Sequence, residues 1–132
     1  MTVMIVDDSA PMRGLLREVV SPVADHVVEC ADGAEFLAGF DACKPDWTVM
    51  DVRMPRLDGV SATRLLHARH PGACVLLVTQ FPSPAILQAA SEAGAVACLA
   101  KEELYRIPEF LPGGSRHPGA ARPGAVTPEA SP

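Results

Sequence analysis

The chain has no excess of basic residues. Its 132 residues carry 11 lysine and arginine side chains against 16 aspartate and glutamate side chains, a formal net charge of −5 at pH 7. Proteins that bind nucleic acids normally present a basic stripe, and no segment of this sequence has one. The charge pattern therefore argues against direct binding of a nucleic acid.

The sequence also lacks a cysteine motif for metal and a long hydrophobic run. Its cysteines form no C-x-x-C pair and have no histidine at ligand spacing: Cys30, Cys43, Cys74 and Cys98. We interpret them as small buried hydrophobic residues in a reducing cytosol. No apolar run reaches transmembrane length, and the first six residues are too short and too soon followed by acids for a signal peptide. We expect a cytoplasmic protein without a membrane partner.

Length and composition predict one globular domain followed by a tail. Apolar residues make up 48% of the chain and charged residues 20%, which is typical of a globular protein. Residues 112–132 hold five prolines and four glycines, more than the roughly 25–30% that marks unstructured segments. We predict a domain over residues 1–111 and a disordered tail over residues 112–132.

Short apolar runs alternate with longer segments of helical periodicity. Five runs have the continuous apolar interiors of parallel strands that are covered on both faces: residues 2–6, 26–30, 47–50, 74–78 and 96–99. Because strand and helix alternate five times, we predict an α/β fold with a doubly wound parallel sheet and right-handed crossovers. Periodicity does not give the strand order.

Helices are predicted between these strands. In the first, the apolar face consists of Met12, Leu15, Leu16, Val19, Val20 and Val23. Pro11 suits its first turn. The second helix is marked by apolar residues at Phe36, Leu37 and Phe40. In the third, near residues 60–69, the expected inward positions are Val60, Thr63 and Leu66.

The last two helices are defined by their ends. The fourth has Ser83 as N-cap, Pro84 in the first turn and Gly94 as its stop. A fifth begins near Lys101 or Glu102. Because proline inside a helix costs about 3 kcal/mol, Pro108 predicts that this helix is short or restarts there.

Polar residues stand at the carboxyl ends of four predicted strands: Asp7 and Asp8, Asp51, Thr79 and Lys101. In an open α/β sheet these ends meet at one edge, where ligands bind. Two negative charges about 4 Å apart repel by roughly 4 kcal/mol at an effective dielectric of 20, and a magnesium ion relieves that repulsion. A carboxylate can attack phosphorus. The pattern predicts a metal and phosphoryl site with an aspartate nucleophile.

Each residue taken alone has a simpler interpretation. Asp8 by itself fits a helix N-cap, Thr79 a turn residue and Lys101 a solvated charge. The four strand ends together favour the shared site.

These residues belong to an ordered set of motifs. The set comprises residues 6–13 (VDDSAPMR), 50–59 (MDVRMPRLDG), 78–79, 94–95 and 101. Over about residues 2–107 the sequence resembles the response-regulator receiver domain of two-component signalling. The segment after Asp51 is most similar to receivers of the FixJ and NarL type, and the lack of an output domain resembles single-domain regulators of the CheY type. The resemblance implies a flavodoxin-like (βα)5 fold with strand order 2-1-3-4-5.

The resemblance also implies roles for individual residues. Asp51 would be the phosphoacceptor. Magnesium would bind Asp51, Asp8 directly, Asp7 through water and the backbone carbonyl of Arg53. Thr79 would hydrogen-bond the phosphoryl group and Lys101 would pair with it, while Pro55 and Gly59 would shape the loop after Asp51.

Three positions depart from the family pattern. Gln80 stands where a small residue is usual, so we predict slow phosphorylation or slow dephosphorylation. Cys98 replaces the usual switch aromatic, and we expect either that Phe81 or Tyr105 substitutes for it or that the usual switch is weakened. Glu102 follows Lys101 in place of proline, and the short fifth helix argues against dimerisation through the fourth and fifth helices. We expect a monomer or weak dimer.

The leading hypothesis is a phosphorylatable switch. Its partners would be a sensor histidine kinase or phosphotransfer protein and a downstream target protein, and it would be no enzyme beyond its own phosphotransfer and dephosphorylation. An alternative is a non-phosphorylated receiver that acts as a constitutive interaction module. A phosphatase of the haloacid-dehalogenase type is disfavoured, because it needs a second acid where Arg53 stands. Unless the chain is part of a longer regulator, a DNA-binding regulator is not expected, since no helix-turn-helix follows residue 111.

Overall fold

A single five-stranded parallel sheet forms the centre of the molecule. The computed structural model describes residues 1–111, so the predicted tail at residues 112–132 lies outside the described residues. The strand order is β2-β1-β3-β4-β5, as expected from the resemblance. The strands are β1 (Thr2–Val6), β2 (His26–Cys30), β3 (Trp47–Asp51), β4 (Val75–Thr79) and β5 (Ala97–Ala100). Each lies within one residue of its predicted bounds.

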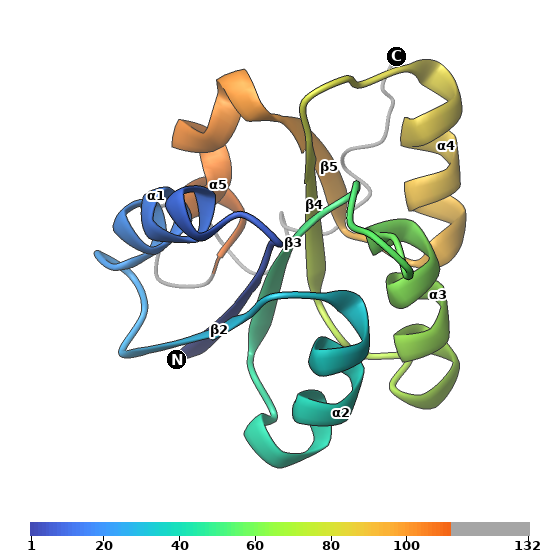
Figure 1. Ribbon diagram of the computed structural model, residues 1–132. Coiled ribbons are helices and arrows are strands. Elements are labelled where there is room, and N and C mark those ends of the chain that lie inside the picture. Colours follow the sequence, from blue (N-terminus) through green and yellow to red (C-terminus); the bar gives the residue numbers. More distant parts are fainter. Residues whose placement is uncertain (112–132) are drawn as a thin grey trace.

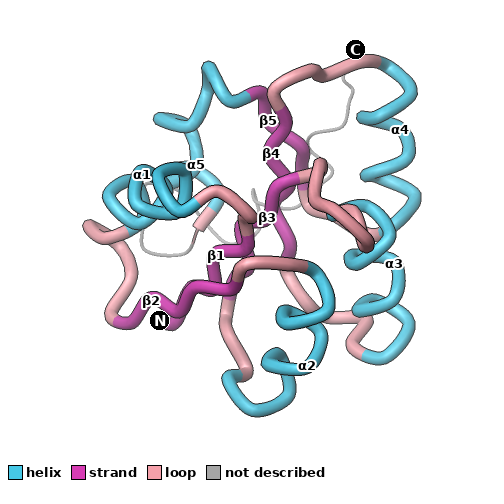
Figure 2. The backbone as a smooth tube through the Cα atoms, in the orientation of Figure 1, coloured by secondary structure: helices cyan, strands magenta, loops and turns pink. Residues whose placement is uncertain are grey.

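Helices cover both faces of this sheet, which gives three layers (Figures 1 and 2). They are α1 (Ala10–Val20), α2 (Gly33–Cys43), α3 (Gly59–Arg69), α4 (Pro84–Ala93), the 3-10 helix η1 (Lys101–Arg106) and α5 (Ile107–Phe110). One face is covered by α1 and α5, and the other by α2, α3 and α4 (Figure 1). This arrangement confirms the doubly wound fold.

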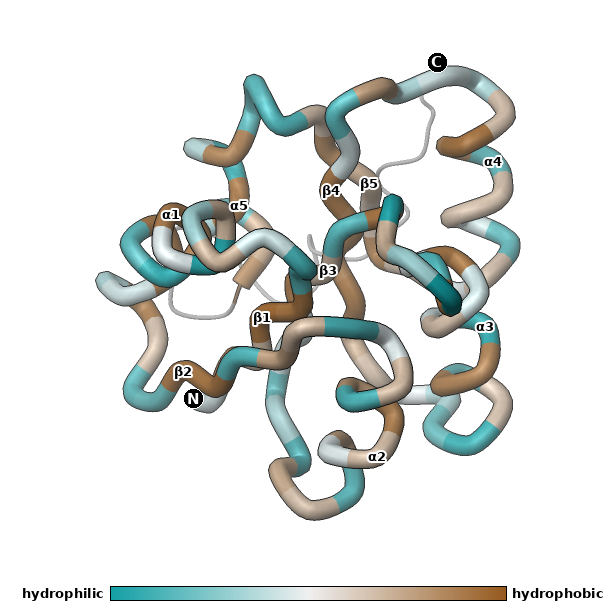
Figure 3. The backbone as a smooth tube through the Cα atoms, viewed as in Figure 1, coloured by the Kyte–Doolittle hydropathy of each residue, from teal (hydrophilic) through white to brown (hydrophobic). Residues whose placement is uncertain are grey.

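The sheet separates two hydrophobic cores. On the side of α1 and α5, Leu16 and Ile107 pack with strand residues such as Val49. On the other side, Phe36 and Leu66 pack with strand residues such as Met50. All residues of β3 and β4 are buried, which explains their continuous apolar runs. Brown, hydrophobic colouring runs along β1 and β4 in the sheet (Figure 3).

Side-chain caps begin four of the helices. The Ser9, Asp32, Asp58 and Ser83 side chains each accept a hydrogen bond from the backbone N–H three residues later. The N-cap predicted at Ser83 is therefore confirmed, and Gly94 ends α4 with a φ of 106°. Ser9 and not Asp8 caps α1, so the Asp8 carboxylate is not used as a helix cap.

Two predictions for the helices need correction. Leu15 belongs to the predicted inward face of the first helix but is 44% exposed, because the buried stripe of α1 is centred on Leu16 and Val20. Val23 lies beyond the end of α1.

The chain after β5 begins as the 3-10 helix η1 and continues as α5, with Pro108 in the first turn, where its missing N–H costs nothing. The predicted short or restarted fifth helix is thus present.

Candidate functional site

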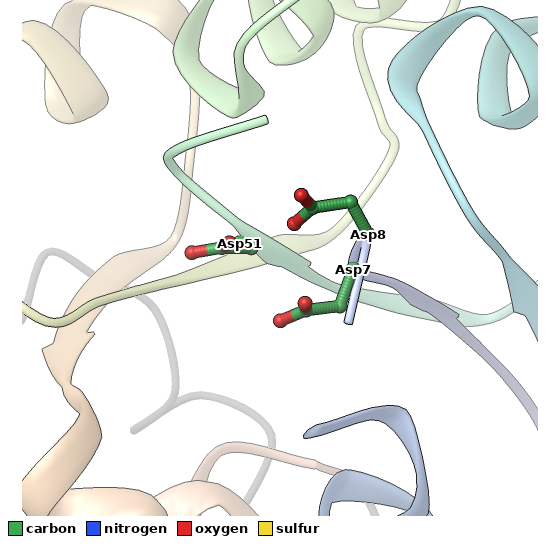
Figure 4. Close-up of side chains that lie close together, drawn as sticks. All are labelled: Asp7, Asp8 and Asp51. Atoms are coloured by element: carbon green, nitrogen blue, oxygen red, sulfur yellow. The ribbon is translucent and has the colours of Figure 1, made fainter. Parts of the chain in front are cut away.

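Three carboxylates meet at the carboxyl edge of the sheet. Asp7 and Asp8 follow the end of β1, and Asp51 is the last residue of the neighbouring strand β3. One carboxylate oxygen of each lies within 4.8 Å of the others (Figure 4). Asp7 and Asp51 are buried, whereas Asp8 is exposed. The strand order brings together acids that are more than forty positions apart in the sequence.

Asp7 is held by its neighbours but keeps one oxygen unsatisfied. Its backbone N–H donates to the Cys30 carbonyl at 3.1 Å, and its Oδ1 accepts from the Ser9 N–H at 2.8 Å. Within the described part of the chain, its buried Oδ2 has no hydrogen-bond partner. Burial raises the pKa of this carboxyl group above its ordinary value. A buried acceptor without a donor is a place where a ligand or cation is favoured.

Lys101 supplies positive charge to this cluster from the end of β5. Its Nζ lies 3.5 Å from Asp51 Oδ1 and 3.8 Å from Asp7 Oδ2. Burial and then the nearby Asp7 charge raise the pKa of Asp51, and Lys101 acts in the opposite direction. One ammonium group faces three carboxylates, so the cluster retains an excess of negative charge.

The donor set of the cluster fits a hard divalent cation. Three carboxylates offer oxygen ligands, and the buried Asp7 Oδ2 among them accepts no hydrogen bond from the described residues. Magnesium prefers a few carboxylates together with water and phosphate oxygens. The exposure of Asp8 leaves one side of the cluster open to such ligands.

Thr79 ends β4 next to Asp51, whose strand partner is Val78. The Thr79 side chain is buried, and its Oγ1 accepts a hydrogen bond from the Phe81 N–H at 3.2 Å. A hydroxyl group accepts and donates at the same time, so its proton remains available to an oxygen in the site.

The loop after β3 packs tightly against Asp51. The Gly59 N–H donates to the Val52 carbonyl at 2.8 Å, which folds the loop back onto the strand end. A Cβ atom at Gly59 would overlap the Asp51 carbonyl oxygen and lie 3.0 Å from its carbonyl carbon. Glycine is therefore required here for close approach, as the motif suggested.

The other residues that the sequence singles out are Gln80, Cys98 and Arg53. Gln80 is exposed directly after Thr79. The Cys98 side chain packs on the core beneath α4, and burial raises its thiol pKa to about 11. Arg53 is exposed, with its guanidinium over the Phe81 ring. Arg13, for which the sequence predicts no role, contacts the site as well. Its contacts depend on Glu29 in β2, and no local pattern predicts that pairing.

Among the described residues, no helix has both the length and the apolar character needed to cross a membrane.

Comparison with known proteins gives a consistent family. A family model for the response regulator receiver domain matches residues 3–107. The chain is 32% identical over 99 residues to the chemotaxis protein CheY of Halobacterium salinarum, covering 75% of this chain and 82% of that protein. It is 34% identical over 103 residues to a protein-glutamate methylesterase/protein-glutamine glutaminase of Pyrococcus horikoshii, covering 75% of this chain. The match spans only 28% of that longer relative.

A solved structure agrees with these matches. A two-component response regulator of the LuxR family from Aurantimonas sp. superposes with a TM-score of 0.77 and 28% identity, over 83% of this chain and 80% of that one. The family model spans most of the chain, and the strand order is that of the same fold. The chain therefore belongs to the response regulator receiver domains of two-component signalling.

Proposed function

We propose that the chain is a phosphorylatable receiver domain and that Asp51 is its phosphoacceptor. The observation that carries this proposal is the position of the Asp51 carboxylate, buried at a strand end with Lys101 at 3.5 Å and two further acids beside it. The phosphoryl donor would be the phosphohistidine of a sensor histidine kinase or phosphotransfer protein. A downstream protein would read the phosphorylated state.

The reaction needs a nucleophile and neutralisation of charge. A carboxylate oxygen of Asp51 forms a bond to phosphorus, and the bond from phosphorus to the donor histidine nitrogen breaks. Lys101 pairs with the transferred group, and the Thr79 hydroxyl donates to one of its oxygens. Water later cleaves the acyl phosphate and restores the carboxylate. Positioning and charge account for most of the catalysis in such transfers.

Asp7, Asp8, Asp51 and the backbone carbonyl of Arg53 would hold the magnesium ion. When bound, the ion neutralises the charge that develops on the phosphoryl oxygens. The buried Asp7 Oδ2, which accepts no hydrogen bond from the described residues, and the excess of negative charge support this assignment. We further propose that residues 1–111 form the receiver and that it acts in the cytoplasm without nucleic-acid contact.

Intact-mass analysis tests the proposal. The protein is incubated with Mg²⁺ and a small phosphodonor such as acetyl phosphate, and wild type is compared with Asp51→Asn. We expect a phosphoryl mass gain in wild type alone. A gain of equal size in Asp51→Asn would assign the phosphoryl group to another residue.

A second candidate function is a receiver that is never phosphorylated and binds its partner constitutively. The side chains of Gln80 beside Thr79 and of Cys98 in place of an aromatic ring favour it. Absence of a mass gain in wild type, together with no response to Mg²⁺ and beryllium fluoride, would support this alternative.

A further inference from the structure

Arg13 connects α1 to the backbone of the acidic cluster. One of its terminal guanidinium nitrogens donates to the Asp7 carbonyl oxygen at 2.7 Å. Its Nε donates to Glu29 Oε1 in β2 at 3.0 Å. The other Glu29 oxygen accepts from Arg17 Nε at 2.7 Å, so Glu29 lies between two arginines. The Arg13 side chain is only 19% exposed, which limits its freedom to leave this position.

The pairing of β1 with β2 ends at Asp7, so the Asp7 carbonyl needs a hydrogen-bond donor from outside β2. Asp7 pairs through its N–H with Cys30, which is the last residue of β2. The guanidinium of Arg13 then takes the place that a further residue of β2 would occupy beside the Asp7 carbonyl. Buried carbonyl groups left without a donor are costly, so the contact stabilises this backbone.

The hydrogen bond from Arg13 to the Asp7 carbonyl also helps to fix the positions of Asp7 and Asp8. Asp7 is held through its N–H, its Oδ1 and its carbonyl by three different residues. The Asp7 carbonyl belongs to the peptide that leads into Asp8, and a planar peptide with a held carbonyl has a defined orientation. The position of the Asp8 Cα atom, from which its side chain starts, is thereby set.

We propose that Arg13 is a positioning residue for the metal ion of this site, acting through the Asp7–Asp8 peptide, and that Glu29 holds Arg13 in place. The inference rests on the proposed function, because it assumes that the acidic cluster binds a divalent cation. Arg13 touches no reacting atom. Partners that orient metal ligands typically change metal affinity by roughly 10- to 100-fold when they are removed.

The sign of the effect separates positioning from simple charge. Arg13 is itself a cation near a cation site, so its charge alone weakens metal binding. Removal of that charge without loss of positioning therefore tightens binding. Loss of the positioning of Asp7 and Asp8 weakens metal binding. Arg17 is the matched control, because it also binds Glu29 but, among the described residues, forms no hydrogen bond to Asp7.

The test measures metal affinity. The dissociation constant for Mn²⁺, with Mg²⁺ as competitor, is obtained from the EPR signal of free Mn²⁺ for wild type, Arg13→Gln, Arg13→Lys and Arg17→Gln. We expect Arg13→Gln to raise the dissociation constant roughly tenfold. We expect Arg17→Gln to stay within about twofold of wild type, because partly exposed ion pairs contribute little.

Arg13→Lys keeps the charge but lacks the planar fork that serves Glu29 and the Asp7 carbonyl together. It should also weaken binding, and it decides the question if Arg13→Gln does not fold. Equal or tighter binding by a folded Arg13 variant would overturn the inference while leaving the proposed function intact. A wild-type protein that binds neither ion would overturn both.

Discussion

The guanidinium carbon of Arg53 lies 5.5 Å from the centre of the Phe81 ring. Arg53 stands two residues after Asp51, and Phe81 stands two residues after Thr79. The pair therefore links the loops that follow β3 and β4, on either side of the position proposed for the phosphoryl group. The Phe81 N–H also donates to the Thr79 hydroxyl, so the ring and the hydroxyl belong to one short turn.

We predict that Phe81→Ala speeds hydrolysis of the aspartyl phosphate by about two- to fivefold. A cation–π contact at an exposed position is worth roughly 0.5–1 kcal/mol, which corresponds to that range in rate. Without the ring, Arg53 no longer spans the two loops, and water gains access to phosphorus. The decay of the phosphoryl mass gain with time measures the rate. Tyr105→Ala, which removes an exposed aromatic side chain of η1, is measured in the same way. A change of equal size in its hydrolysis rate would favour Tyr105 as the functional aromatic residue.

Gly59→Ala should destabilise the domain by about 2–3 kcal/mol, because the new methyl group would overlap the Asp51 carbonyl and displace the strand end. Chemical denaturation measures the loss in unfolding free energy. Gly14→Ala is the control, since a Cβ there meets nothing within 4 Å and alanine favours the helix by about 0.5–1 kcal/mol. Equal stability of wild type and Gly59→Ala would show that the loop relaxes at little cost.

Asp51→Asn should raise the stability of the metal-free protein at pH 7 by about 1 kcal/mol, or roughly 4 °C in melting temperature. The pKa values of Asp7 and Asp51 are raised above their ordinary value of 3.8 in the folded protein, chiefly by burial. Between pH 3.8 and the raised pKa values, the Asp7 and Asp51 carboxyl groups are therefore more protonated in the folded protein than in the unfolded chain. The stability contributed by these groups is complete below pH 3.8 and is lost as the pH rises through the raised pKa values.

Thermal melts in EDTA from pH 4 to pH 8 check this prediction. The advantage of Asp51→Asn should shrink as the pH falls, because the wild-type carboxyl becomes protonated. Glu18→Gln, at an exposed position on α1, removes the same charge and should have little effect. A lower melting temperature for Asp51→Asn at pH 7 would mean that its ion pair with Lys101 outweighs the cost of burial.

Gln80→Ala should raise the rate of phosphorylation or of dephosphorylation by at least about threefold, or about 0.6 kcal/mol of barrier. Gln80 directly follows Thr79, and its side chain is exposed beside the position where the phosphoryl group would bind. Time courses of mass gain and loss separate the two rates. Gln88→Ala, an exposed position on α4, should leave both unchanged. Rates identical to those of wild type would show that Gln80 does not affect phosphorylation or dephosphorylation at this site.

The strands were predictable because each is a continuous apolar run bounded by polar residues, and the hydrophobic effect acts on that local pattern. The inward positions Val60, Thr63 and Leu66 are all buried for the same reason. Leu15 was not predictable in this way. Two adjacent leucines both fit the helical period, and only the packing of α1 on the sheet selects Leu16 as the buried one.

The sequence by itself determined which residues stand at strand ends, and therefore that Asp7, Asp8, Asp51, Thr79 and Lys101 would share one edge of the sheet. Local periodicity is enough for that, because all parallel strands end at the same edge. Only the tertiary structure decided which Asp7 oxygen lacks a hydrogen-bond donor among the described residues and that Arg13 holds the Asp7 carbonyl. Those features depend on contacts between elements far apart in the chain, and such contacts follow from strand order and helix packing.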